Sequence, residues 1–231
     1  MTIPCSQPFP LDMVWVVEYS QYRKIMDTLI KLFGSSAKVK AVKLFVFNPG
    51  VPYDAVQIAT RTKENLSKVR REVGLLEKMG LIHRKVFYKT IDRRVRGRMT
   101  HPKVKANGWI LDESFQHMIP LQAFLVSLNH LEPKDIARKL SRTGSIKLII
   151  VSGIFIQNSE SRVDLLVVGD NIKKGLLESA IKTIEAEIGK EIRYAFFETP
   201  VFKYRLGLYD KLIRDILDFD HQKVVNKLGI I

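Results

Sequence analysis

The stretch Ile58–Ile82, IATRTKENLSKVRREVGLLEKMGLI, decides how the first half of this chain folds. Apolar residues recur through it at steps of three and four, at Leu66, Val69, Val73, Leu76 and Met79. That spacing predicts a helix with one apolar face. Asn65 stands where a side chain caps a helix start, and Gly80 stands where a helix ends in a left-handed turn. A shorter helix is expected just before Asn65, so the stretch predicts two helices joined by a tight turn.

The flanking residues extend this pattern in both directions. Upstream, residues 22–33 and 34–47 each have the pattern of a helix, and the Pro-Gly pair at residues 49–50 stops the second one. Downstream, residues 80–89 predict a strand and residues 108–111 predict its partner. Between the two strands lies a basic loop in which Asp92 is the only acid. The first half therefore predicts a series of helices that ends in a helix-turn-helix and is followed by a two-stranded wing.

The charge of the chain is concentrated in the same region. The chain carries 38 Lys and Arg against 24 Asp and Glu over 231 residues, a formal net charge of +14. Residues 21–110 hold 21 of the basic residues and six of the acidic ones, whereas residues 111–231 hold 17 and 16. Such concentration favours a polyanionic partner, of which nucleic acid is the commonest. An acidic membrane surface is the alternative, but no strongly amphipathic basic helix is found to lie on one.

Residues 22–111 resemble bacterial winged-helix transcriptional regulators, in which the opening stretch would be the second helix, the turn and the recognition helix. The resemblance implies a winged-helix domain at residues 22–112 and duplex DNA as its partner. It also implies a homodimer, because two-fold dimers are the usual form of such regulators. With the apolar face buried, the recognition helix presents the candidate DNA-binding residues Lys63, Asn65, Ser67, Lys68 and Arg71. The wing adds Arg93, Arg94, Arg96 and Arg98. The alternative for each of these side chains is an ordinary solvated surface.

Several other classes of protein do not fit the sequence. Residues 1–21 form an N-terminal arm without the basic and apolar segments of a signal peptide. The uncharged runs are too short and too polar to span a bilayer, so no membrane partner is expected. Cys5 is the only cysteine, which excludes a disulfide within the chain and a cysteine-based zinc site. The five His are scattered without the spacing of metal ligands. We therefore expect a cytoplasmic protein that carries no metal and no cofactor.

Residues 113–144 have the pattern of a helical linker. Leu121, Phe124, Leu125 and Leu128 fall on one helical face, and Pro133 begins a second helix. An apolar helix that follows a wing suits a dimerisation element, and it suits equally well a cover for the neighbouring domain. The sequence leaves both roles open.

Residues 145–231 alternate strands with helices. The runs at residues 145–155 and 162–170 are nearly continuous in apolar side chains, as expected for strands that are buried on both faces. A helix, a third strand and a pair of helices follow. The sequence therefore predicts an α/β (α+β) fold, in which this second domain is a mixed sheet covered by helices.

This order of elements, with Ser152 and Gly153 ahead of Asp164, resembles the minimal nucleotidyltransferase domain. In that family a Gly-Ser turn holds a phosphate, and an Asp-x-Asp pair with a third carboxylate binds two Mg²⁺ ions. In this chain the turn is reversed, Arg162 stands in the place of the first carboxylate, and Arg193 in the place of the third. Asp164 is the remnant of the catalytic set. We expect Arg162 to pair with Asp164 or to stand where the charge of a metal would be.

Three roles stay open for this remnant: a structural acid, a metal-free ligand or phosphate pocket lined by Ser152, Gly153 and Arg162, and an active transferase using Mg²⁺. The function we expect is that of a DNA-binding transcriptional regulator. Its second domain would be catalytically inactive and would sense a nucleotide or small-molecule effector, bind a partner or dimerise. The alternatives are an active nucleotidyltransferase that modifies a protein or RNA, and a non-catalytic, antitoxin-like interaction module.

Overall fold

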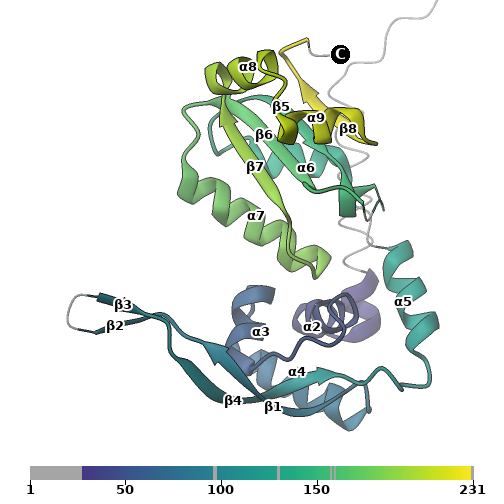
Figure 1. Cartoon of the computed structure of the whole chain (residues 1–231). Helices are drawn as coiled ribbons and strands as arrows, with labels where there is room; N and C mark the ends of the chain where they lie inside the picture. The colour runs from purple at the N-terminus through teal and green to yellow at the C-terminus, as the bar shows by residue number, and fades with distance from the viewer. Residues whose placement is uncertain (1–27, 96–97, 129–130, 157, 159, 230–231) are drawn as a thin grey trace, which may run out of the picture.

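The computed structural model describes residues 28–95, 98–128, 131–156, 158 and 160–229 of the chain. These residues form a mixed α+β fold with two parts, the first built around one core and the second around a core on each face of its sheet. Figure 1 shows the N-terminal part in the lower half of the view and the C-terminal part in the upper half. The N-terminal arm predicted at residues 1–21 lies outside the described residues. Within the described residues, no helix is long and apolar enough to cross a membrane.

Three helices form the centre of the N-terminal part. They are α2 (Ser36–Val46), α3 (Ala55–Thr62) and α4 (Leu66–Lys78), preceded by helical backbone at residues 28–33. Their apolar faces meet in one core that contains Phe45, Ile58, Val69, Val73 and Leu76. Met79, predicted to join that face, is instead 58% exposed because α4 ends at Lys78 and Met79 is its C-cap.

Polar side chains fix where these helices begin. The Ser35 hydroxyl accepts a hydrogen bond from the Lys38 backbone N–H at the start of α2. At the start of α3, the Asp54 carboxylate accepts from Val56 and Gln57, and the Gln57 side chain accepts from the Asp54 backbone N–H in return. Asn65 caps α4 by accepting from the Ser67 N–H at 2.8 Å, as predicted. On the other side of the three-residue turn, the Lys63 backbone N–H donates to the Ala59 and Thr60 carbonyl oxygens and ends α3.

A long antiparallel ribbon follows α4. It pairs β1 (Ile82–Thr90) with β4 (Lys103–Leu111), and β2 (Arg93–Val95) pairs with β3 (Arg98–Thr100) at its tip. Tyr53 and Trp109 exchange both backbone hydrogen bonds at 2.9 Å, which ties the ribbon to the segment before α3. A Cβ atom at Gly108 would lie 2.3 Å from the Tyr53 carbonyl oxygen, so this approach requires glycine.

The predicted helical linker at residues 113–144 is divided between the two parts. Helix α5 (Met118–Ser127) buries Leu125 in the N-terminal core, and Met118 and Leu121 pack on the same core. Helix α6 (Pro133–Leu140) buries Ile136 and Leu140 in the C-terminal part. The two helices therefore each complete a neighbouring core, so covering is the role that the structure supports.

The C-terminal part is a four-stranded sheet with helices on both faces. The strand order is β7 (Tyr194–Glu198), β6 (Leu165–Asp170), β5 (Ser145–Val151) and β8 (Gln222–Asn226), and the pair of β6 and β7 is parallel. Alternate residues of β6 enter opposite cores, with Leu165 and Val167 on one side and Leu166 and Val168 on the other. The first core is completed by α6 and α7 (Lys174–Ile188), and the second by α8 (Thr199–Gly207) and α9 (Lys211–Asp218).

Candidate functional site

The face of α4 that points away from the core carries a stripe of small and basic residues. Ser67, Arg71, Gly74 and Lys78 follow one another at steps of four, three and four, opposite the buried Val69, Val73 and Leu76. Ser67, Arg71 and Lys78 are exposed, as are Lys68 and Arg70 on the flanks of the stripe. A Cβ atom at Gly74 would meet no atom within 4 Å, so nothing in the described structure covers the middle of this stripe.

Arg71 forms an ion pair with the buried carboxylate of Glu72, the next residue of α4. Its guanidinium donates to Glu72 at 3.1 Å, and Lys38 of α2 lies 3.5 Å from the other oxygen of Glu72. Burial alone would raise the pKa of Glu72, but hydrogen bonds from Arg71 and Ser35 and the charge of Lys38 lower it overall. Glu72 therefore stays ionised, while the side chain of Arg71 remains 68% exposed.

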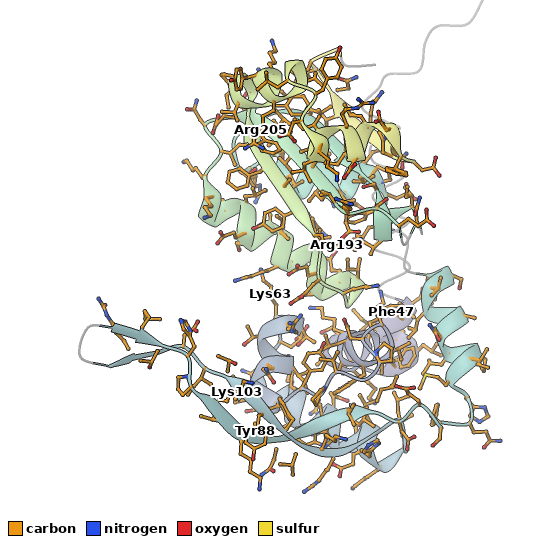
Figure 2. The ribbon with its side chains drawn as sticks, viewed as in Figure 1. Phe47, Lys63, Tyr88, Lys103, Arg193 and Arg205 are labelled. Carbon is orange, nitrogen blue, oxygen red and sulfur yellow. The ribbon has the colours of Figure 1, made fainter. Side chains whose placement is uncertain are left out.

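One face of the ribbon continues the basic surface. The register pairs Arg84 with Trp109, Val86 with Asn107 and Tyr88 with Lys105, so these side chains share a face. Arg84, Tyr88, Lys103, Lys105 and Asn107 are all exposed, and Tyr88 reaches 71%. Figure 2 shows Tyr88 and Lys103 on the ribbon, on the side of the molecule remote from the C-terminal sheet.

Glu77 braces α4 against the ribbon. Its two oxygens accept hydrogen bonds from the Trp109 indole N–H at 2.9 Å and from Arg84 Nε at 2.8 Å. These two hydrogen bonds lower the pKa of Glu77, so the carboxylate is ionised at neutral pH. Because Arg84 and Trp109 face each other across the ribbon, the brace fixes the helix and the ribbon as one surface.

The structure distributes the predicted DNA-binding residues over three places. Asn65, Ser67, Lys68 and Arg71 lie exposed at the start and along the outward side of α4, and Arg94 is exposed on β2 near the tip of the ribbon. Arg96 lies outside the described residues, and for Arg93 and Arg98 the structure describes only the strand backbone.

Lys63 lies in the third place. Its ammonium donates to the Ser179 carbonyl oxygen at 2.9 Å and to the Thr183 hydroxyl at 2.7 Å, both on α7. Figure 2 shows Lys63 reaching from α3 towards α7. Lys63 lies in the turn before α4, and its ammonium already forms hydrogen bonds with the C-terminal part. We therefore leave Lys63 out of the candidate nucleic-acid interface.

Sequence reasoning missed Arg70 and Arg84. Arg70 sits on the flank of α4, and a helical projection of the whole helix would have placed it in the exposed half. Arg84 follows the buried Leu81 and Ile82, and its exposure depends on the pairing of β1 with β4, which the sequence does not fix.

Both carboxylate oxygens of Asp164 accept two hydrogen bonds each. Oδ1 accepts from the Ile154 backbone N–H and from Arg193 Nη2, and Oδ2 accepts from the Arg193 backbone N–H and from Arg193 Nε, at 2.9–3.1 Å. The carboxylate is completely buried, and its hydrogen bonds to the guanidinium raise the pKa of Arg193. The expected partner, Arg162, was the wrong one. Arg162 instead lies 3.3 Å from Asp215 of α9. The parallel pairing of β6 with β7 begins at Leu165 and Tyr194, so it places residue 193 beside Asp164.

The expected phosphate cradle of Ser152, Gly153 and Arg162 does not come together. The buried Ser152 hydroxyl donates to the Val163 carbonyl oxygen, and Arg162 points to α9. Gly153 has φ +55°, and a Cβ atom there would lie 2.0 Å from Asp164 Oδ1. The reversed Ser-Gly order therefore serves the local packing of the turn around Asp164.

The residues around Asp164 do not fit a magnesium ion. Each of its oxygens already accepts two N–H groups, and the nearest side chain is a cation that grips it in two places. Among the residues that the structure describes, no group of three or more His, Cys, Asp and Glu side chains could hold a metal ion. A divalent cation prefers several oxygen ligands, so it would have to displace Arg193.

Comparison of the chain with protein-family models, with curated proteins and with solved structures finds no match. Assignment of a function therefore rests on the geometry of α4 and the ribbon and on the occupied state of Asp164.

Proposed function

We propose that this protein is a DNA-binding transcriptional regulator whose N-terminal part is a winged helix. The observation that carries the proposal is that the exposed basic residues on the outward side of α4 and on one face of the ribbon belong to elements that Glu77 holds together. Figure 1 places both elements on the side of the molecule opposite the C-terminal sheet, so a long polyanion can reach them together. The local excess of 15 positive charges over residues 21–110 supplies the attraction.

The dimensions of α4 suit the DNA major groove. A helix with its side chains is about 10–12 Å across, and the major groove is about 12 Å wide. In such a docking, Asn65, Ser67 and Arg71 lie at the N-terminal half of the helix, where residues of a recognition helix reach base edges. Arg71 and Asn65 can bind a base in two places, whereas Lys68 suits a phosphate. The bare backbone at Gly74 lets the helix lie close to the groove floor.

The ribbon would follow the neighbouring sugar-phosphate backbone. Strands of nine residues span roughly 30 Å, at about 3.3 Å per residue. Lys103 and Lys105 lie on the part of β4 nearest the tip, and Arg94 lies beyond them on β2, which suits contacts with phosphates far from α4. The brace through Glu77 would keep these contacts in register with those of α4.

In this proposal the C-terminal part is regulatory and not catalytic. Asp164 is the carboxylate that matches the nucleotidyltransferase pattern. It supports this proposal because both of its oxygens already accept hydrogen bonds from Arg193 and from backbone N–H groups. A cytoplasmic homodimer that binds two half-sites of a duplex operator is the assembly we propose.

The proposal is tested by selecting duplexes from a random library with the full chain and measuring affinity for the enriched sequence. The Lys68→Ala/Arg71→Ala variant should bind at least about tenfold more weakly, since one good base contact contributes about 1–3 kcal/mol. The matched control is Lys203→Ala/Lys211→Ala, which removes two exposed lysines on α8 and α9 and should stay within about twofold of the parent. A library that shows no enrichment, or equal affinity of both variants, rejects the proposal.

A further inference from the structure

A cavity of about 650 Å³ lies where the two parts of the molecule meet. The N-terminal part supplies Phe47 and Asn48 from the end of α2 and Val126 from α5, and the C-terminal part supplies Phe155, Ile188 and Arg193 among others. Figure 2 shows Phe47 and Arg193 on opposite sides of this junction. The volume lies within the range of about 300–1,000 Å³ that small-molecule sites occupy.

The polar groups of the wall favour an anion. Asp164 is neutralised by Arg193, and Glu191 pairs with Arg61 at 2.5 Å, so neither carboxylate adds a net charge. Lys190 is exposed on the wall and forms no ion pair with another residue that the structure describes. The Arg193 guanidinium uses Nε and Nη2 on Asp164 and is 52% exposed, which leaves the edge at Nη1 for another acceptor. The wall therefore offers one net positive charge and N–H donors.

The remainder of the wall is apolar and contains two aromatic rings. Phe47 and Phe155 come from the two different parts of the molecule, and Ile154, Ile188 and Val126 also line the cavity. Such a wall binds the flat, apolar body of a ligand, while the cations fix its charged end.

We propose that this junction cavity is an effector site for a small organic anion, a carboxylate, sulfonate or phosphate monoester carried on an apolar ring-sized body. Lys190 and Arg193 bind the anionic group, and Phe47 and Phe155 enclose the body. The site lies beside Asp164 but uses the outer edge of Arg193, not the carboxylate. The consequence for DNA rests on the proposed function, whereas the binding itself does not.

Residues 188–193, which form part of the cavity wall, also contact α3 and the end of α2, the two helices next to α4. Asn48 donates to the Gly189 carbonyl oxygen at 2.7 Å, and Arg61 of α3 pairs with Glu191. Two residues after Arg61, Lys63 donates to α7 and begins the turn into α4. A ligand that contacts Lys190 and Arg193 therefore binds to residues on either side of Glu191. A shift of the Glu191 backbone would move Arg61 and Lys63, and with them the N-terminal end of α4. Such coupling is reciprocal between ligand and DNA.

The test uses the full chain without DNA and two fluorescent probes, anilinonaphthalene sulfonate and its uncharged relative phenylnaphthylamine. Lys190→Glu should weaken binding of the sulfonate about tenfold or more and change binding of the uncharged probe less than about twofold. Val126→Trp fills the cavity from an exposed position of α5 and should abolish binding of both. Lys182→Glu, the same charge reversal at an exposed position of α7, should behave like the parent. Sulfonate binding that is the same in all four proteins overturns the site.

A second measurement tests the coupling. With the sulfonate at saturation, the affinity of the parent for its selected duplex should change by about threefold or more, and that of Lys190→Glu should not. If the probe binds as described but DNA affinity is unchanged, the coupling is rejected and the site stands. If no duplex is bound at all, the probe measurement still decides the site, because it contains no DNA.

Discussion

Asp164 is held by a single residue from both its backbone and its side chain. Arg193 donates its backbone N–H, Nε and Nη2, and Ile154 donates the fourth hydrogen bond. A fully buried carboxylate is stable only when its lone pairs and its charge are both satisfied. The pair therefore acts as a structural clamp between β6 and the start of β7, and Gly153 is required beside it because any side chain would collide with the carboxylate.

Replacing Arg193 by methionine should lower the free energy of unfolding by about 2–4 kcal/mol, because it leaves a buried charge without its partner. Because the guanidinium is half-exposed, the loss is smaller than the roughly 3–5 kcal/mol of a fully buried pair. The matched variant Arg162→Met removes an exposed ion pair with Asp215 and should cost about 1 kcal/mol or less. Urea denaturation of both proteins at pH 7 measures the difference. Equal losses would contradict the assignment of Arg193, and not Arg162, as the partner of Asp164.

At this scale the sequence predicts residue types but not partners. The pattern around Ser152 and Asp164 could be recognised from the chain, and so could the basic residue at position 193. The pairing of Asp164 with Arg193 depends on the parallel register of β6 and β7, which brings together residues 29 apart. No local signal fixes that register, so Arg162, only two residues from Asp164, was the wrong partner.

Helix α4 contains a glycine, Gly74, in the middle of its outward stripe. Gly74 has a helical neighbour on each side, and a Cβ atom there would meet nothing within 4 Å. A glycine inside a helix lowers the free energy of unfolding by about 0.5–1 kcal/mol relative to alanine. No contact at Gly74 in the described structure requires the absence of a side chain. A glycine at this position leaves room for another molecule to approach the helix backbone closely.

The Gly74→Ala variant should therefore be more stable than the parent by about 0.5–1 kcal/mol, and should bind the selected duplex more weakly. Thermal unfolding measures the first effect, and a titration with duplex DNA measures the second. The control is Ser127→Ala at the end of α5, far from the stripe, which should leave DNA affinity unchanged. A gain in stability without any loss of affinity would remove Gly74 from the DNA-facing surface.

At the scale of elements, the sequence predicts the helices of the N-terminal part well, because their apolar periodicity and their caps agree. The first strand of the ribbon was predicted well, but β4 begins at Lys103, five residues before the partner strand that was predicted at residues 108–111. Strand β8 was not predicted, because residues 222–226 mix charged and apolar side chains and lie at the edge of the sheet, where only one neighbour constrains them. The division of residues 113–144 between two cores depends on tertiary packing, which no local pattern records.

The two parts of the molecule are joined around a buried lysine. Lys43 of α2 is 2% exposed and donates to the Glu187 carbonyl oxygen at 3.0 Å, and Gly189 packs directly against it. Burial lowers the pKa of Lys43 to about 8, against the opposing effect of Glu187. Between pH 8 and the unfolded value of 10.5, the unfolded chain binds more protons at this position than the folded chain does. The free energy of unfolding due to Lys43 therefore rises with pH across this window and is constant below it.

The difference in unfolding free energy between the parent and Lys43→Met isolates this effect, because other groups titrate equally in both proteins. From pH 7 to pH 10 the difference should move in favour of the parent by about 2 kcal/mol. Urea denaturation at pH 7, 8, 9 and 10 measures it. A difference that stays constant with pH would show that Lys43 is not buried at the junction as described.

The salt dependence of binding tests most directly whether α4 and the ribbon form one surface for duplex DNA. Each neutralised phosphate contributes about 0.9 to the slope of log affinity against log salt, so on the order of five contacts predict a slope near −4 to −5. The full chain is measured by fluorescence anisotropy on its selected duplex from roughly 50 to 300 mM salt. The Arg94→Ala/Lys103→Ala/Lys105→Ala variant should flatten the slope by about 2–3, and Lys203→Ala/Lys211→Ala should leave it unchanged. Absence of binding at the lowest salt, or a slope that the ribbon variant does not change, would contradict a shared surface.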